Sequence, residues 1–320
     1  MKNLNVQAYR GLLMIWIVLF HYTARITQLY PDYTFPVQFS NGGEVGVMYF
    51  FALSGFFFFK GIEKYERLGV VSTAKFALNK YWRLWTPYII SLIIIFAILR
   101  IFELPGRVPA IKNFLIDSIF LYHPHADYID SAHWFLASLC LIQIVSALFL
   151  LIDRSKRDVV ILAFEIILFG ALLVNSVTHD AITGQITSIL CARSFLMFLI
   201  GYNIFKHTWP SIITGCALVA YFAITISPLW VTIHAIITIF VLYSSIQIPH
   251  LKALHTAGNY SFPWYLIHQN IGYLLIIALY DNGCTNELFL LVPIAATFIL
   301  SVGIHHCSTL FPAKLLNFKR

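Results

Sequence analysis

The amino-acid sequence predicts an all-α membrane protein, a bundle of about ten helices that forms one domain over residues 1–320. Hydrophobic residues make up 59% of the chain and charged residues only 11%, whereas an average soluble domain has roughly 25% charged residues. The mean hydropathy is +0.79. Apolar runs near the ~20 residues that cross a bilayer divide the whole chain, so no room is left for a separate soluble domain.

Charged residues, Pro or Gly bound each apolar run. Several runs are shorter than ~20 residues, and Pro228 and Pro263 interrupt two of them, so we expect some tilted or kinked helices. The run at 114–121 is too short to cross and is expected to lie at the interface or to re-enter the membrane. In chain order, the predicted spans are 9–25, 45–60, 85–102, 134–152, 159–177, 189–205, 210–226, 229–246, 262–280 and 288–310.

The basic residues predict the orientation, because Lys and Arg are retained on the cytoplasmic side. With the N-terminus inside, alternate connections collect most of the 21 basic residues. Both termini are then cytoplasmic. The residues on this side are Lys2, Lys60, Lys64, Arg67, Lys75, Lys80, Arg83, Arg154, Lys156, Arg157, Lys206, Lys252, Lys314, Lys319 and Arg320, and the opposite side keeps Arg25, Arg100, Arg107, Lys112 and Arg193.

The charge and the cysteines predict neither a nucleic-acid partner nor a disulfide or metal site. In such an apolar chain the net charge of +7 is explained by the Lys and Arg residues that fix the orientation in the membrane, so we expect no nucleic-acid partner. The cysteines show no CxxC pair and no metal-ligand spacing, which predicts neither a disulfide nor a metal site. They are Cys140, Cys191, Cys216, Cys284 and Cys307.

The first span carries two ionisable residues. Placing such residues inside a membrane costs free energy, so they are candidates for function. Arg10 lies near the cytoplasmic end, and His21 follows eleven residues later. Eleven residues are about three helical turns, or ~16 Å, so both side chains project from one face. A cation at the mouth and an imidazole at depth suit a long anionic ligand. The alternative is an Arg that extends to the interface and a His held by structural hydrogen bonds.

Several segments between residues 7 and about 270 carry recognisable motifs. In order, they are Arg10 with His21, GEVGVMYFFALSGF at 43–56, KYWRLWTP at 80–87, HWFL at 133–136 and GNYSFPWYLIH at 258–268. Together these segments resemble the acyltransferase 3 family of integral-membrane acyltransferases. The chain departs from the family pattern in having Gln7 three positions before Arg10, where the family often has an acidic residue, and Asn79 beside Lys80 in place of a basic pair.

This resemblance implies transfer of an acyl group, most often acetyl, from acetyl-CoA or another acyl-CoA to a hydroxyl of an envelope glycan or a lipid-linked sugar. It implies a protein of the bacterial cytoplasmic membrane, surrounded by lipid. Arg10, Lys80 and Arg83 would bind the CoA phosphates, since Arg contacts phosphate in a bidentate manner. His21 would act as general base, or as a nucleophile that forms an acyl-imidazole.

The remaining candidates have competing interpretations. Glu44 is a candidate to orient His21, or is a solvated glutamate. His133 and Trp134 are candidates to bind the acceptor, although Trp at a span end also suits the membrane interface. For His268 we favour structural hydrogen bonding. Ser54 and Gly55 are explained by close helix packing.

Another class of function stays open. A transporter or flippase could use Arg10, His21 and Arg193 as a polar pathway for an anionic substrate. Transporters often have two halves with corresponding broken helices, and the sequence shows no such repeat. A catalytically inactive scaffold is a third option, and a homo-oligomeric assembly is compatible with the sequence.

Overall fold

The computed structural model describes residues 4–119, 128–246, 251–284, 286–312 and 315. Within these ranges the chain is helical and has no strand. α1 (Leu4–Leu19), a π-helical turn (Phe20–Arg25) and α2 (Ile26–Leu29) form one helical segment. This segment packs against α12 (Lys252–Asp281) and α3 (Gly42–Ile62).

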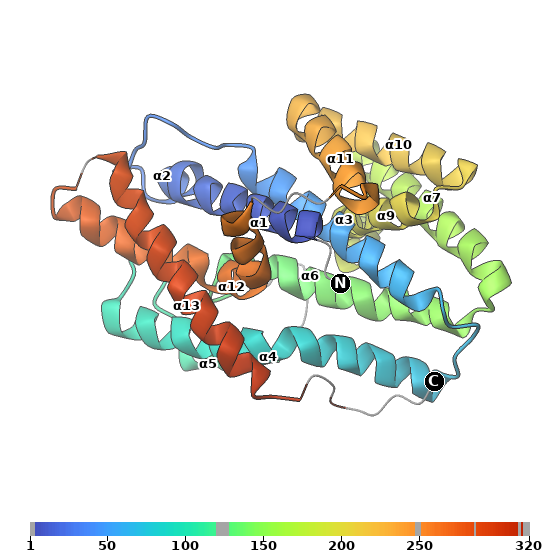
Figure 1. The fold of residues 1–320 in the computed structure, drawn as a ribbon, viewed down its shortest axis with the longest axis horizontal. Helices are drawn as coiled ribbons and strands as arrows, with labels where there is room; N and C mark the ends of the chain where they lie inside the picture. Colours follow the sequence, from blue (N-terminus) through green and yellow to red (C-terminus); the bar gives the residue numbers. More distant parts are fainter. Residues whose placement is uncertain (1–3, 120–127, 247–250, 285, 313–314, 316–320) are drawn as a thin grey trace.

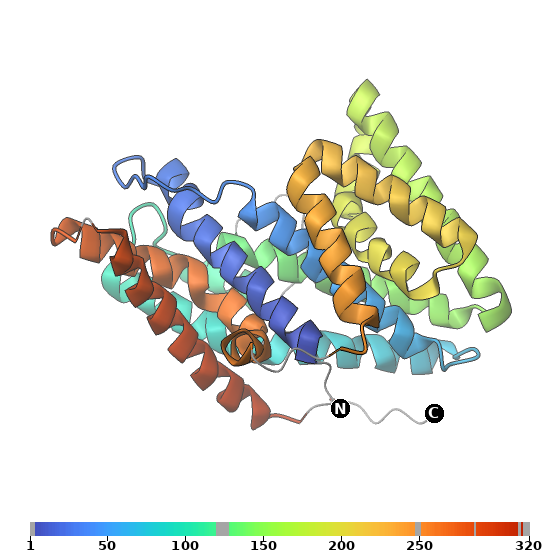
Figure 2. The same cartoon turned by 45° about the horizontal axis from the view of Figure 1, so that its top comes forward.

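The other helices surround this centre. α4, α5 and α13 lie on the side of α12, whereas α7, α10 and α11 lie on the other side, over α3 and α9 (Figures 1 and 2). Their bounds are α4 Val70–Phe102, α5 Ile111–Ser118, α6 Trp134–Ala147, α7 Arg154–Thr178, α8 Ala181–Ile189, α9 Ala192–Lys206, α10 Trp209–Thr225, α11 Pro228–Tyr243 and α13 Leu291–Thr309.

Glycines allow two central helix pairs to approach closely. A Cβ on Gly11 of α1 would lie 2.2 Å from the Leu254 carbonyl oxygen of α12, and a Cβ on Gly55 of α3 would lie 1.9 Å from the Phe198 carbonyl oxygen of α9. Both distances are far below van der Waals contact, so a side chain at either position would separate the helices. Small residues serve this purpose in many membrane bundles, and the expectation for Gly55 agrees with the structure.

Each predicted span falls on a helical region, but the predicted number of about ten crossings is not confirmed. Seven helical segments of the described chain are long and apolar enough to cross a membrane, and α8 with α9, bent by 55°, would make an eighth. α10 has 17 residues and α11 has 16. These two helices are too short to count as spans by themselves.

The sequence interpretation of the segment before the third span was wrong. Lys75, Lys80 and Arg83 were placed in a connection, whereas α4 is a continuous helix from Val70. The physical reason is that Lys and Arg are good helix formers, and the apolar side chains between them pack inward, as Phe76 does against Phe58. A polar stretch next to an apolar one therefore continued the helix instead of ending it.

Proline had different effects at its different positions. Pro228 starts α11, as expected for a residue without a backbone N–H. Pro263 lies inside α12 and Pro87 inside α4, and neither ends its helix. α12 therefore continues through Pro263 as one helical segment, and the expected kink at this position stays a prediction.

The short run predicted at the interface forms α5, which lies beside α4. Trp85 donates its indole N–H to the Ser118 carbonyl, with a distance of 2.8 Å, and the Phe96 and Phe114 rings are 4.9 Å apart. α5 therefore runs back along α4 from the C-terminal end of α4, and its position at the interface or as a re-entrant segment stays a prediction. The end of the predicted run, at Leu121, lies outside the described residues.

Contacts between connections define two ends of the bundle. At one end, Leu68 N–H donates to the Leu150 carbonyl, Glu63 pairs with Arg154 and Lys206, and Asn5 contacts Ile246. We call this end the basic face, because it carries most of the predicted cytoplasmic cations. Lys2, Lys314, Lys319 and Arg320 lie outside the described residues.

The connections at the other end are also tied together. Tyr33 donates to Asp281 at 3.0 Å, Tyr30 donates to the Pro105 carbonyl at 3.0 Å, and Arg193 pairs with Glu44. We call this end the opposite face. The structure therefore separates the two sets of connections that the charge pattern predicted.

Candidate active site

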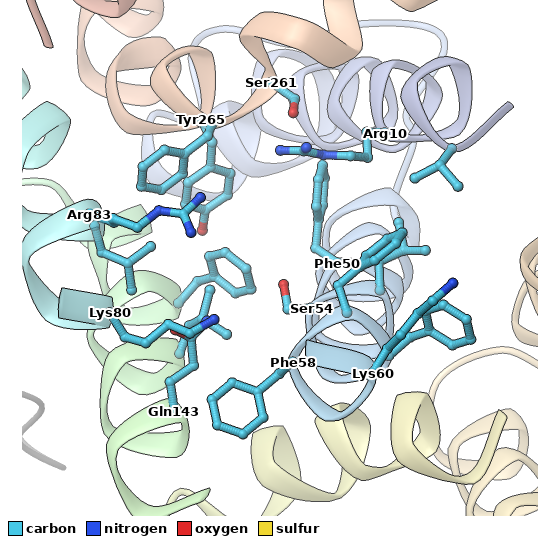
Figure 3. A pocket seen from close by; sticks show the side chains of 18 of the residues that line it. Arg10, Phe50, Ser54, Phe58, Lys60, Lys80, Arg83, Gln143, Ser261 and Tyr265 are labelled. Carbon is cyan, nitrogen blue, oxygen red and sulfur yellow. The ribbon is translucent and has the colours of Figure 1, made fainter. Parts of the chain in front are cut away.

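A cavity of about 730 Å³ opens in the half of the bundle near the basic face, between α1, α3, α4, α6 and α12. Its size lies within the roughly 300–1,000 Å³ of typical small-molecule sites. Figure 3 shows its lining side chains from these helices. The three residues to which the resemblance assigned the CoA phosphates, Arg10, Lys80 and Arg83, all line it.

The cavity has a strong positive charge. Lys60 joins Arg10, Lys80 and Arg83, and no Asp or Glu is among the described lining residues. In Figure 3, Arg10 of α1 and Arg83 of α4 extend toward the central space from two sides, and Lys80 extends toward it from one turn below Arg83. Residues three apart share a helix face, which explains why α4 presents both of its cations here.

These cations are not neutralised by carboxylates. Among the described residues, none of the four takes part in an ion pair. Lys80 lies instead over two aromatic rings, with Nζ 5.0 Å from the Phe58 ring centroid and 5.4 Å from that of Phe76. An anionic ligand would complete the charge balance of the cavity.

The rest of the lining is mostly apolar. Polar groups come from Gln7, Ser54, Gln143 and Ser261, and Tyr265 lies near Arg83 in Figure 3. The apolar wall consists of Val6, Phe50, Leu53, Phe56, Phe57, Phe58, Leu84, Phe135, Leu139, Leu242 and Phe262. The cavity thus suits an elongated ligand that has both anionic and apolar parts.

His21 does not line this cavity and lies deeper, in the π-helical turn that follows α1. Its Nδ1 is 3.1 Å from the Tyr273 hydroxyl, and its ring centroid is 4.8 Å from that of His268 in an edge-to-face arrangement. π-helical turns are rare and often occur at functional sites. A chain of rings links His21 to the cavity, because Tyr265 lines the cavity and its ring centroid is 5.4 Å from that of His268.

His268 is fully buried and has one free nitrogen. Its Nδ1 is 2.7 Å from the Tyr265 carbonyl oxygen, and a carbonyl can only accept, so Nδ1 carries the proton. In the neutral ring Nε2 is then an acceptor, and it has no hydrogen-bond partner among the described residues. A hydroxyl group that reached Nε2 could donate to it.

The structure places Glu44 away from His21. Its Oε1 accepts from Arg193 Nη2 at 2.5 Å and from Arg193 Nε at 3.1 Å, and its side chain is half exposed. Among the described contacts it has no hydrogen bond to His21. The proposed orientation of His21 by Glu44 stays a prediction without a supporting contact.

The two candidate acceptor residues have different environments. His133 is buried, and its Nε2 is 3.0 Å from the Leu266 carbonyl oxygen of α12, which makes Nε2 the donor. Its Nδ1 has no partner in the described part of the chain. Trp134 is 41% exposed and lines a separate hollow of about 320 Å³ that also includes Arg193.

Three residues beside His21 were missed by sequence reasoning. Tyr273 contacts the His21 ring directly, Arg107 lies over the Tyr273 ring, and Asn270 accepts from Arg107. Tyr273 is one of 17 tyrosines and lies just after the motif at 258–268, so no motif or spacing distinguished it. Arg107 was noted only as a basic residue on the predicted outer side.

The described residues contain no group of three His, Cys, Asp or Glu side chains that could hold a metal ion. The chemical groups that the site does present are the imidazoles of His21 and His268, the Tyr273 hydroxyl and the cationic side chains of the cavity. The arrangement can bind a polyanion at one end and remove a proton at the other.

Comparison with known proteins gives one match. The model of the family described as an acyltransferase domain, acyltransferase 3, matches residues 3–306. No curated protein matches significantly, and neither does any solved structure.

Proposed function

The chain belongs to the acyltransferase 3 family and is a multi-pass membrane acyltransferase, and from this premise we propose its donor, acceptor and catalytic base. The donor is acyl-CoA, acetyl-CoA in the first place, and the acceptor is a hydroxyl of an envelope glycan or a lipid-linked sugar. The protein acts in the bacterial cytoplasmic membrane. One observation carries the proposal: an uncompensated cationic cavity is linked through Tyr265 and His268 to His21.

The cavity fits the donor by its charge and its shape. Coenzyme A carries phosphates at one end and its thioester at the other, with a long flexible arm between them. Arg10, Lys80 and Arg83 would hold the phosphates, and the apolar wall would accommodate the arm. His21 follows Arg10 by eleven positions, which correspond to ~16 Å of helix, so a donor anchored at Arg10 would present its acyl end near His21.

His21 would act as the general base. Its Nδ1 is 3.1 Å from the Tyr273 hydroxyl. With Nδ1–H donating to that hydroxyl oxygen, the unprotonated Nε2 would take the proton from the acceptor hydroxyl while the oxygen attacks the thioester carbonyl. The new C–O bond forms, the C–S bond breaks, and the CoA thiolate leaves and receives the proton that His21 took from the acceptor. Tyr273 would keep the ring in position for this step.

The same geometry supports transfer across the membrane. The cavity lies near the basic face, and His21 lies toward the opposite face, where Tyr273 and Arg107 are. We propose that the donor enters from the cytoplasmic side and that the acceptor reaches His21 from the other side. The family assignment gives no support to the transporter alternative.

The direct test is an assay of purified protein with radiolabelled acetyl-CoA and an envelope extract from the source cells. We expect release of the free CoA thiol together with label in the glycan or lipid-linked fraction. His306→Ala is the matched control for changes at His21, because His306 is exposed on α13. Binding or uptake of acetyl-CoA without loss of the thioester would contradict the proposal.

Sidedness has its own test in proteoliposomes of known orientation. Label should reach an acceptor on the opposite face only when acetyl-CoA is supplied on the basic face, which carries Lys60 and Arg154. Equal rates with donor and acceptor both confined to the basic face would contradict transfer across the membrane, and would leave an enzyme that works on one side.

A further inference from the structure

Two arginines lie beside His21 on its side toward the opposite face. The positive-inside tendency disfavours Lys and Arg there, so each arginine on this side needs a structural reason. For Arg193 the reason is its ion pair with Glu44. Arg25 and Arg107 are both half-buried and both close enough to His21 to interact with it electrostatically.

The described groups that contact the Arg107 guanidinium are neutral. Its Nη1 donates to Asn270 Oδ1 at 2.8 Å, and its Cζ lies 5.7 Å from the Tyr273 ring centroid. It also lies beside the Tyr30 hydroxyl. The loop that carries it is fixed, because Arg107 N–H donates to the Leu104 carbonyl at 2.9 Å.

Arg25 is positioned by the π-helical turn. It follows His21 by four residues, close to one π-helical turn, so both side chains are near one face of the segment. Its Nη1 donates to Gln28 Oε1 at 2.8 Å, another neutral partner. Among the described residues, neither Arg25 nor Arg107 forms an ion pair.

The nearby carboxylate of Asp130 is already engaged. Its Oδ1 accepts from the Ala132 backbone N–H at 3.0 Å, and its Oδ2 is 3.4 Å from the Asn270 backbone nitrogen. Asp130 is fully buried and makes no described ion pair with Arg107. Within the described part of the chain, the two guanidinium groups therefore have hydrogen-bonding capacity left for an oxyanion, with which Arg forms its strongest hydrogen bonds.

We propose that the acceptor carries an oxyanion, a phosphate or a carboxylate, near the hydroxyl that is acylated, and that Arg107 with Arg25 binds it. This inference rests on the proposed acyl transfer and specifies the acceptor class. The Tyr273 side chain connects the two parts of the site, because its ring lies under Arg107 and its hydroxyl contacts His21 Nδ1. An oxyanion at Arg107 thus fixes the acceptor a few ångströms from the base.

The test labels the natural acceptor. Membranes from the source cells that contain only variant protein receive radiolabelled acetyl-CoA, and the labelled product is passed over an anion exchanger at pH 7. We expect an anionic product. Arg107→Gln should raise the KM for the acceptor about tenfold or more, since a hydrogen bond between charged groups is lost. It should leave the KM for acetyl-CoA unchanged, and Arg107→Lys should recover part of the loss.

Arg100→Gln is the matched control, because Arg100 is an exposed arginine at the end of α4 on the same face. Each variant is first compared with wild type by size-exclusion chromatography and thermal unfolding. A KM for the acceptor that is the same in Arg107→Gln and wild type would overturn the inference. A neutral labelled product would also overturn it.

A lipid headgroup is the other source of phosphate at this depth. The measurement is therefore repeated in a nonionic detergent, with and without added phosphatidylglycerol. We expect the same defect of Arg107→Gln in both conditions. A defect that appears only with phosphatidylglycerol would show that Arg107 binds lipid, and the inference would be wrong. Absence of label with wild-type protein would contradict acyl transfer itself, and the inference would fall with it.

Discussion

The cationic cavity and the cluster around His21 hold their polar groups in opposite ways. In the cavity, Arg10 and Arg83 have no hydrogen bond to the described residues, and Lys80 lies only over aromatic rings. Around His21, the nitrogen Nδ1 has a hydroxyl partner, and the neighbouring His268 is fixed by a carbonyl. A flexible polyanion is bound well by long, adjustable cations, whereas a base must be held in one orientation.

The largest effect that the comparison predicts is at His21. His21→Ala should lower the rate of transfer by about 10²–10⁴, the usual contribution of a general base, while leaving binding of acetyl-CoA to the cavity intact. Transfer and donor binding are measured on the same purified sample, with His306→Ala beside it. Near-normal transfer in His21→Ala would contradict the assignment of the general base to His21.

Tyr273→Phe should have the next largest effect. The variant keeps the ring under Arg107 but loses the hydroxyl that contacts His21 Nδ1. We expect kcat to fall about tenfold, which corresponds to the ~1.4 kcal/mol that one well-placed hydrogen bond contributes, with the KM for acetyl-CoA unchanged. Steady-state kinetics separate the two constants.

Tyr280→Phe is the control for Tyr273, because it changes a tyrosine on the same helix whose ring packs against Tyr33. It should leave kcat unchanged. If Tyr273→Phe instead raised the KM for acetyl-CoA, the cavity and the His21 cluster would not be separate parts with separate tasks.

Arg10→Ala tests the other half of the comparison. It should raise the KM for acetyl-CoA several-fold to about tenfold, because a hydrogen bond between charged groups contributes roughly 1.5–3 kcal/mol and Lys80 and Arg83 remain. Arg10→Lys should recover only part, since the bidentate fork is lost. Kinetics at varied acetyl-CoA check this, and a loss confined to kcat would assign Arg10 to the chemistry instead.

The sequence predicted the two regions unequally. Arg10, Lys80 and Arg83 were found because buried charge is conspicuous in an apolar chain and because they fall in recognisable motifs. The location of Lys80 and Arg83 on α4 was missed, since a polar half-helix resembles a connection when only hydropathy is considered. The all-helical class followed from composition alone.

The surroundings of His21 were far less predictable. Tyr273 is 252 residues away along the chain, and Arg107 is brought near by a loop that Tyr30 holds at Pro105. Neither contact follows from periodicity, because the first depends on how α1 and α12 cross and the second on where the loop after α4 meets α12. The crossing itself depends on Gly11, where a Cβ would lie 2.2 Å from a carbonyl oxygen of α12. Such close approaches appear only in three dimensions.

Substitution of Glu44 is expected to have the smallest effect, and it tests whether the group of residues that act with His21 extends to α3. Its carboxylate is paired with Arg193, and both side chains are substantially exposed. Exposed ion pairs contribute roughly 0–1 kcal/mol, so Glu44→Gln should change the free energy of unfolding by less than about 1 kcal/mol and kcat by less than about twofold. Arg193→Gln should give the same small change, and the double variant should add little, because each single variant already breaks the pair. These values come from denaturation curves and kinetics of the four proteins. A loss in kcat of tenfold or more that is specific to Glu44→Gln would restore the sequence-based prediction that Glu44 orients His21, and would extend the catalytic cluster to the start of α3.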